Sequence, residues 1–116
     1  MSEFSFSKEA RLLDAAAYKR VFDGADSKAS HQHLLLLGRR NQLSHHRLGL
    51  VISKKNVRLS VQRNRVKRVA REFFRHHSSD DAGFDVIVLA RKGIDKLDNA
   101  ALAVVLAQQW QKLVQS

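Results

Sequence analysis

The sequence contains no cysteine among its 116 residues, so it can form neither disulfide bonds nor thiolate metal sites. It has no run of about 18 apolar residues, and we therefore predict no membrane-spanning helix. Its first ten residues, MSEFSFSKEA, lack the charged and apolar regions of a secretory signal. With no such signal, the cytoplasm is the expected compartment.

Carboxylates are scarce and poorly clustered. A metal-dependent nuclease needs several carboxylates that converge on its ions. Asp80, Asp81 and Asp85 form the only cluster, and the first two lie in a predicted polar connection. No glycine-rich loop of the phosphate-cradling kind is present. We therefore expect a binding protein without catalytic residues of its own.

Histidine is the remaining source of metal ligands, and its six copies fall in close pairs. A metal site needs ligands that converge in space, whereas neighbouring histidines on loops usually point apart. The pairs are His31 and His33, His45 and His46, and His76 and His77. We predict solvated histidines, with no metal site and no cofactor bound by the protein.

Positive charge is abundant and concentrated. The chain has 21 basic and 11 acidic residues, a net charge of +10. Nine of the basic residues and only one acidic residue lie between Lys54 and Arg75. A solvated helix face is the alternative explanation, but such faces usually mix both signs. The patch therefore predicts a polyanionic partner.

The length fits one domain, residues 1–116, with a small apolar core. The pattern predicts helix, strand, strand, helix, strand and helix, an α/β layer arrangement. The predicted elements are a helix over Asp14–Phe22, strands over His33–Arg40 and Arg47–Ser53, a helix from an N-cap at Ser60 to about Phe74 or His77, a strand over Phe84–Ala90, and a final helix capped by Asp98 or Asn99.

The two earlier strands are expected to pair through a hairpin-like loop at Asn41–His46, and Asp23–Ser30 is expected to be a loop. Tyr18 and Phe22 lie four residues apart on one face of the first helix. Aromatic residues on a helix are usually part of the core. If this helix borders a groove, they could instead stack on the bases of a single strand.

The helix predicted from Ser60 has two different faces at about 100° per residue. One arc of roughly 140° carries Arg63, Asn64, Lys67, Arg68, Arg71 and Arg75. The opposite arc carries Leu59, Val66, Val69, Ala70 and Phe73. Arg65 lies outside the cationic arc, where it could reach a second contact or pair with an acid. One arginine guanidinium can donate to two phosphate oxygens at once. The helix therefore predicts a nucleic acid partner, without deciding between RNA and DNA.

At SKKNVRLSVQRNRVKRVAREFFR the sequence resembles the protein subunit of bacterial ribonuclease P. The signature of that family is a Lys-Lys pair that ends a strand, a short spacer, and Arg-Asn-Arg at the start of a basic helix. Further stretches also match: FSKEARLLDAAAYKRVF, HRLGLVISKKN and ARKGIDKLDNAAL. The resemblance thus covers nearly the whole chain in the family order.

The resemblance implies an α+β sandwich of the ribosomal protein S5 domain 2-like type, with a left-handed β-α-β crossover. It implies a non-catalytic subunit of the endoribonuclease that removes the 5′ leader from precursor tRNA and leaves a 5′-phosphate. The RNA subunit carries the chemistry with Mg²⁺, and the protein joins it one to one.

The resemblance also implies the site residues. Those facing the RNA are Lys54, Lys55, Arg58, Arg63, Asn64, Arg65, Lys67, Arg68 and Arg71. Tyr18 and Phe22 match aromatic positions of the leader cleft, although the first is commonly Phe in the family. Two other readings stay open: a ribosomal or RNA-chaperone protein of similar fold, and a DNA-binding protein whose basic helix enters a major groove.

Overall fold

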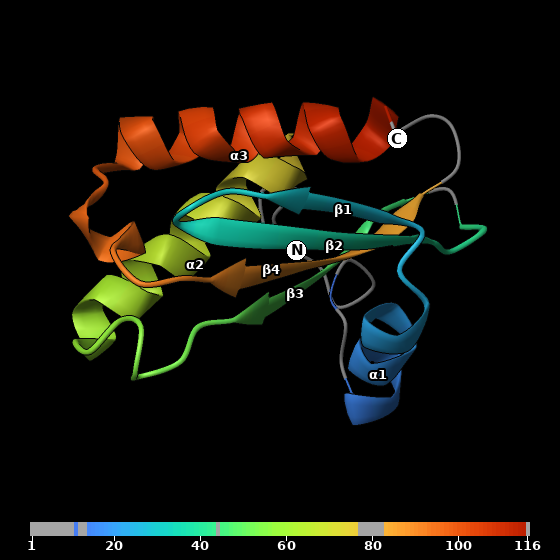
Figure 1. Ribbon diagram of the computed structural model, residues 1–116, viewed down its shortest axis with the longest axis horizontal. Coiled ribbons are helices and arrows are strands. Elements are labelled where there is room, and N and C mark those ends of the chain that lie inside the picture. The colour runs from blue at the N-terminus through green and yellow to red at the C-terminus, as the bar shows by residue number, and fades with distance from the viewer. Residues whose placement is uncertain (1–10, 12–13, 44, 77–82, 116) are drawn as a thin grey trace, which may run out of the picture.

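The computed structural model describes residues 11, 14–43, 45–76 and 83–115. Within them, three α-helices and a short 3₁₀ helix, η2, accompany one four-stranded sheet (Figure 1). The predicted α+β class is confirmed. The elements in chain order are α1 (Ala15–Gly24), β1 (Ser27–Ser30), β2 (Leu34–Arg40), β3 (Arg47–Val51), α2 (Ser60–Arg75), β4 (Phe84–Ala90), η2 (Ile94–Lys96) and α3 (Asn99–Gln115).

Strand β1 was expected to be part of a loop, and this prediction is wrong. Its sequence, SKAS, has none of the β-branched or aromatic residues that favour strands. Tertiary contacts form it instead. β1 pairs antiparallel with β2 from Ser27 opposite Gly38 to Ser30 opposite Leu35, and α3 packs against it. Ser27 and Ala29 are accordingly buried while the intervening Lys28 is exposed.

The strand order is β1-β2-β4-β3, so β2 and β3 are not neighbours and the expected hairpin is wrong. β4 lies between them, antiparallel to β2 and parallel to β3. Its sequence, FDVIVLA, explains this position, because six of its seven residues are buried and a central strand must be covered on both faces. The remaining elements extend outward from this apolar strand.

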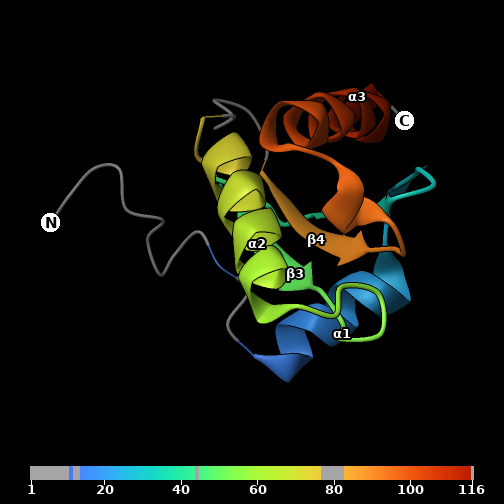
Figure 2. The same cartoon turned by 90° about the vertical axis from the view of Figure 1, so that its left-hand side faces the viewer.

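The connection from β3 through α2 to the parallel β4 is a left-handed crossover. In Figure 1 both strands point to the left and α2 lies behind the sheet, as the turned view in Figure 2 shows. General rules strongly favour the right-handed form. The expectation taken from the family resemblance is therefore confirmed against the general rule.

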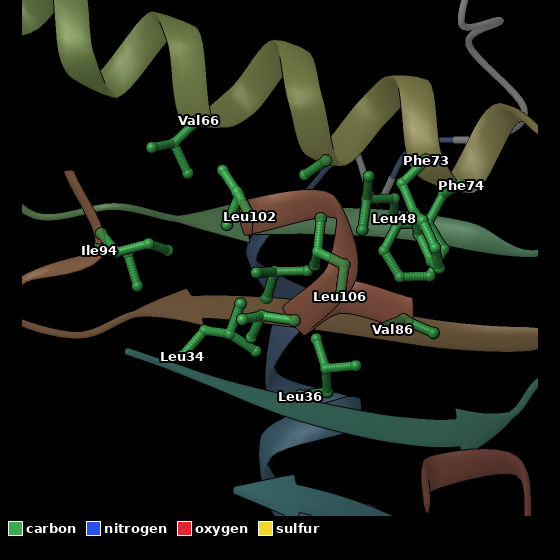
Figure 3. Packing of buried hydrophobic residues seen from close by; sticks show 14 of the residues in the cluster. Leu34, Leu36, Leu48, Val66, Phe73, Phe74, Val86, Ile94, Leu102 and Leu106 are labelled. Carbon is green, nitrogen blue, oxygen red and sulfur yellow. The ribbon is translucent and has the colours of Figure 1, made fainter. Parts of the chain in front are cut away.

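The main core lies between the sheet and the pair α2 and α3 (Figure 3). Alternation along β2 sends Leu34 and Leu36 into this core, where both are fully buried. Leu102 and Leu106 meet them from α3, and Val66 from α2. Each fully buried aliphatic side chain of this kind stabilises the fold by about 1.5–3 kcal/mol.

The other face of the sheet is covered by α1. Ala17 and Val21 pack on Ile87 of β4, with Tyr18 and Leu37 partly buried beside them. Asp14 caps α1, because its side chain accepts a hydrogen bond from the Ala17 backbone N–H at 2.8 Å. The helix is therefore fixed at its start, with its buried side on the sheet.

The caps of the two longer helices differ from each other. Asp98 caps α3 as predicted, accepting from the Ala101 backbone N–H at 2.7 Å. The predicted cap at Ser60 is wrong by one position, because Leu59 is the N-cap of α2 and makes no side-chain hydrogen bond there. The first turn of α2 is instead held by backbone bonds from Gln62 and Arg63 to the Leu59 carbonyl.

Candidate nucleic-acid interface

Helix α2 has one buried side and one exposed side, as its sequence predicts. Val66, Ala70 and Phe73 are buried against the core. Leu59 is an exception, because it is 54% exposed although the pattern placed it on the apolar arc. It precedes the first helical residue, so the 100° spacing of a helix does not apply to it.

The exposed side of α2 carries side chains that have no partner within the described residues. Asn64, Arg68 and Arg71 are exposed and make no hydrogen bond or ion pair with any residue that the structure describes. Lys67 is half-buried beside them. Their charges are therefore available to an external anion. We call Asn64, Lys67, Arg68 and Arg71 the α2 ridge.

Arg63 is bound to the segment that precedes the helix. Its Nη1 donates to the backbone carbonyls of Val57 at 3.0 Å and Arg58 at 2.9 Å. Both acceptors are neutral, and the guanidinium forms no ion pair with a carboxylate of the described residues. The bond fixes the start of α2 relative to the turn that carries Lys54 and Lys55.

That turn is itself well anchored. The Asn56 side chain donates to the Ala90 carbonyl at 2.9 Å, and Val57 is fully buried. Lys54 and Lys55 are exposed at the tip of the turn, and Arg58 is exposed after it. The structure therefore brings this basic pair next to the start of α2, as the predicted site requires.

Arg65 is also bound within the protein. Its Nε donates to Gln62 Oε1 at 2.8 Å, its Nη1 to Asn99 Oδ1 at 2.9 Å, and its Nη2 to the Asp95 backbone carbonyl at 3.1 Å. It thus links α2 to η2 and to the first residue of α3. Its position outside the cationic arc was predicted from the sequence, whereas these neutral acceptors were not.

Arg75 does not contribute to the ridge in the way the helical pattern predicted. Its guanidinium forms an ion pair with Glu72, which also contacts His76. The hydrogen bond from Arg75 lowers the pKa of the Glu72 carboxyl, and the nearby positive charges act in the same direction. The end of α2 is consequently less cationic than its middle.

The two aromatic residues of α1 have different environments. Phe22 is 46% exposed, whereas Tyr18 is half-buried on the cluster around Val21. The hydroxyl oxygen of Tyr18 accepts a hydrogen bond from the Leu50 backbone N–H at 3.3 Å. Phe22 is thus presented to solvent, and Tyr18 is tied to the edge strand β3.

Asp85 has a structural partner. Its carboxylate accepts from Arg47 Nε at 2.7 Å and from the side-chain amide of Asn41 at 2.9 Å. The hydrogen bond to Asp85 raises the pKa of Arg47. Asp80 and Asp81, the other members of the sequence cluster, lie outside the described residues. Within the described part of the chain, no three His, Cys, Asp or Glu side chains could together hold a metal ion.

The histidines also differ in their surroundings. His46 is buried, and its Nδ1 accepts a hydrogen bond from the Phe84 backbone N–H at 2.9 Å. Its ring meets the Trp110 ring edge-on, with the ring centroids 4.9 Å apart. His31 and His33 belong to the turn between β1 and β2, with ring centres 5.6 Å apart. His77 lies outside the described residues.

None of the described helices has the length and apolar character to cross a membrane.

These features define a class of small basic α+β proteins with a left-handed crossover and an outward-facing arginine-rich helix. The sequence pattern of the Ribonuclease P family matches residues 6–114. The chain therefore belongs to the family of bacterial ribonuclease P protein components, which are subunits of the ribonuclease P holoenzyme and act in tRNA processing. This membership implies association with the RNA of ribonuclease P.

Individual relatives agree. The chain is 51% identical over 108 residues to the ribonuclease P protein component of Stutzerimonas stutzeri, covering 93% of this chain and 82% of the relative. It is 48% identical over 111 residues to that of Pseudomonas aeruginosa, covering 96% and 82%.

Solved structures show the same fold. A Staphylococcus aureus RNase P protein mutant with defective mRNA degradation activity superposes with a TM-score of 0.81 at 27% identity, covering 90% of this chain and 87% of that one. The RNase P protein from Thermotoga maritima gives 0.72 at 25% identity, covering 87% and 96%.

Proposed function

We propose that the protein binds the catalytic RNA of ribonuclease P through the α2 ridge and the adjoining turn, and the 5′ leader of precursor tRNA through the α1 side of the sheet. The observation that carries the proposal is the arrangement of Asn64, Arg68 and Arg71. They project from a helix whose opposite side is fixed in the core, and no described residue neutralises them.

The RNA-binding surface has two kinds of members in this proposal. The α2 ridge, together with Lys54, Lys55 and Arg58, contacts phosphates directly, because these side chains are free to move toward them. Arg63 and Arg65 hold neighbouring segments in place, and they add positive charge because their acceptors are neutral. The positive potential also speeds encounter with RNA.

Phe22 and Tyr18 serve the leader. The exposed ring of Phe22 offers a stacking platform for an unpaired base. The partly buried Leu37 and Leu89 continue the apolar surface of the sheet beside Tyr18. β2 contributes no aromatic side chain to this surface, so stacking falls to α1. The phosphodiester cleavage itself and its Mg²⁺ ions belong to the RNA subunit.

Reconstitution tests this function. Purified protein is added to the matching ribonuclease P RNA at low Mg²⁺, and cleavage of a precursor tRNA is measured. We expect the protein to restore cleavage that the RNA alone performs poorly under these conditions. Absence of stimulation would favour a general RNA-binding role, and tighter binding to duplex DNA than to this RNA at matched salt would favour a DNA-binding role.

A further inference from the structure

The sheet face that α1 covers consists of rows of side chains that run across the strands. In Figure 1 α1 lies on the opposite side of the sheet from α3. Alternate residues of β2, β4 and β3 point to the α1 face, and the strand registers align them. The row directly under α1 contains Leu37 and Ile87, on which Ala17 and Val21 pack. The rows on its two sides differ in chemistry.

The row on one side of α1 is apolar. It consists of Leu35, Leu89 and Val51, which are all half-buried. Tyr18 of α1 packs on the same cluster as Leu89 and Val51, and its hydroxyl oxygen accepts from the backbone N–H of the residue before Val51. The apolar row therefore belongs to the surface that the proposed function assigns to the leader. Phe22 follows Tyr18 by one turn of the helix.

The row on the other side of α1 is polar. It consists of Arg39 on β2, Asp85 on β4 and Arg47 on β3, each in register with the next. The Asp85 carboxylate accepts from Arg47 Nε at 2.7 Å and from Arg47 Nη2 at 2.5 Å. We call these three residues the polar row. Two arginines share one carboxylate, so the row carries one net positive charge.

Arg39 holds the last turns of α1. Its Nη1 donates to the Arg20 backbone carbonyl at 3.1 Å. Its guanidinium also lies against Gly24, where a Cβ would be 3.1 Å from Nη1 and 3.4 Å from Cζ. The C-terminal end of a helix favours a cation, yet the last turn of α1 has no basic residue and contains Asp23. Arg39 supplies the missing cation from the sheet.

The polar row acts on the start of α1 as well. The hydrogen bond to Asp85 raises the pKa of Arg47, and the negative charge of Asp14 acts in the same direction. Asp14 is the residue that caps α1 through the Ala17 backbone N–H. One end of the polar row is therefore coupled to the first turn of the helix and the other end to the last.

We propose that Arg39 is a positioning residue for the leader of precursor tRNA: it fixes the last turns of α1, and with them the Phe22 ring, without contacting the leader. Its two contacts, at Arg20 and Gly24, lie two residues before and two residues after Phe22. The polar row and the apolar row lie on opposite sides of the row under α1, so Arg39 acts from behind the helix. This inference rests on the proposed role of Phe22 in leader binding.

The test is a double-mutant cycle of Phe22→Ala and Arg39→Ala in the reconstituted holoenzyme. The measured quantity is the ratio of the affinities for precursor and mature tRNA. We expect Arg39→Ala to lower this ratio about threefold and Phe22→Ala about fivefold. The double variant should lose no more than Phe22→Ala alone, because a positioning residue has no effect once the ring that it positions is gone.

Arg40→Ala is the matched control. It removes the same charge from the next residue of β2, which is exposed and lies over the Phe84 ring with its Cζ 5.2 Å from the ring centroid. The affinity ratio of this variant should equal that of the wild type. Amide hydrogen exchange of the free protein gives a second readout. Exchange in the last turn of α1 should be faster in Arg39→Ala and unchanged in Arg40→Ala.

Different outcomes would overturn the positioning role and the leader role. Losses of Phe22→Ala and Arg39→Ala that multiply in the double variant, or a salt slope of leader binding lowered by about 0.7 in Arg39→Ala, would show that Arg39 contacts the leader itself. A wild-type affinity ratio in Arg39→Ala would also overturn the positioning role. A wild-type ratio in Phe22→Ala would instead refute the leader role of Phe22, on which the inference rests.

Discussion

The two sides of α2 differ in burial and in physical role. On the inner side, Val66 and Phe73 are buried and stabilise the fold. On the outer side, Arg68 and Arg71 have no partner among the described residues and contribute little to folding. Arg63 and Arg65 lie between these extremes, because they are bound to neutral acceptors while their charges remain. Residue type alone therefore does not decide the role of an arginine in this helix.

The largest effect is expected on the inner side. Phe73→Ala removes a buried ring that meets Phe74 edge-on at 5.0 Å, and should destabilise the protein by about 3–5 kcal/mol. Urea denaturation measures this loss, and Phe73→Leu should show a smaller one. The salt slope of RNA binding, measured where the variant is folded, should stay at the wild-type value. A lower salt slope of RNA binding with an unchanged free energy of unfolding would contradict the assignment of the inner side of α2 to folding and the outer side to binding.

Arg65→Ala should give an intermediate result. It removes three hydrogen bonds, two of which join α2 to Asp95 of η2 and Asn99 of α3, at a cost of about 1–3 kcal/mol in the free energy of unfolding. Arg65→Lys keeps the charge but not the planar set of donors, and should recover little of that stability. An unchanged free energy of unfolding, together with a salt slope of RNA binding lowered by about one, would show instead that Arg65 only binds phosphate.

A smaller effect is expected on α1, which also has a buried and an exposed side. Phe22→Ala should weaken binding of leader-bearing tRNA, toward the lower end of the roughly 1–3 kcal/mol of one stacked base. Phe22→Ala should lower the free energy of unfolding less than the loss of a buried aromatic residue does, because the ring is 46% exposed. Binding to the holoenzyme is compared for precursor and mature tRNA. Equal losses on both would assign Phe22 to packing alone.

Much of the fold follows from the sequence, because periodic apolar residues determine which faces are buried. The pattern located β2, β4 and both long helices, and the two-sided character of α2. It missed β1, whose four residues gain strand structure only from pairing with β2 and packing under α3. It also paired β2 with β3, because chain proximity does not reveal that β4 enters between them.

The site was predictable in composition but not in detail. The charge pattern located the exposed Arg68 and Arg71, since periodicity alone decides their direction. The acceptors of Arg63 and Arg65 are backbone carbonyls and amide side chains, some of them about thirty residues away in the chain. Such acceptors carry no signal in composition, so only the folded structure could separate the anchored arginines from the free ones.

The most direct test of the account is the salt dependence of ribonuclease P RNA binding by Arg68→Ala/Arg71→Ala. Two controls are measured beside it: the wild-type protein, and Lys19→Ala/Arg20→Ala, which removes two exposed charges of α1. The ridge variant should unfold like the wild type, bind RNA more weakly, and have a salt slope lower by about 1.4–1.8. A salt slope and an RNA affinity equal to those of the wild type would contradict the claim that the outer side of α2 binds RNA.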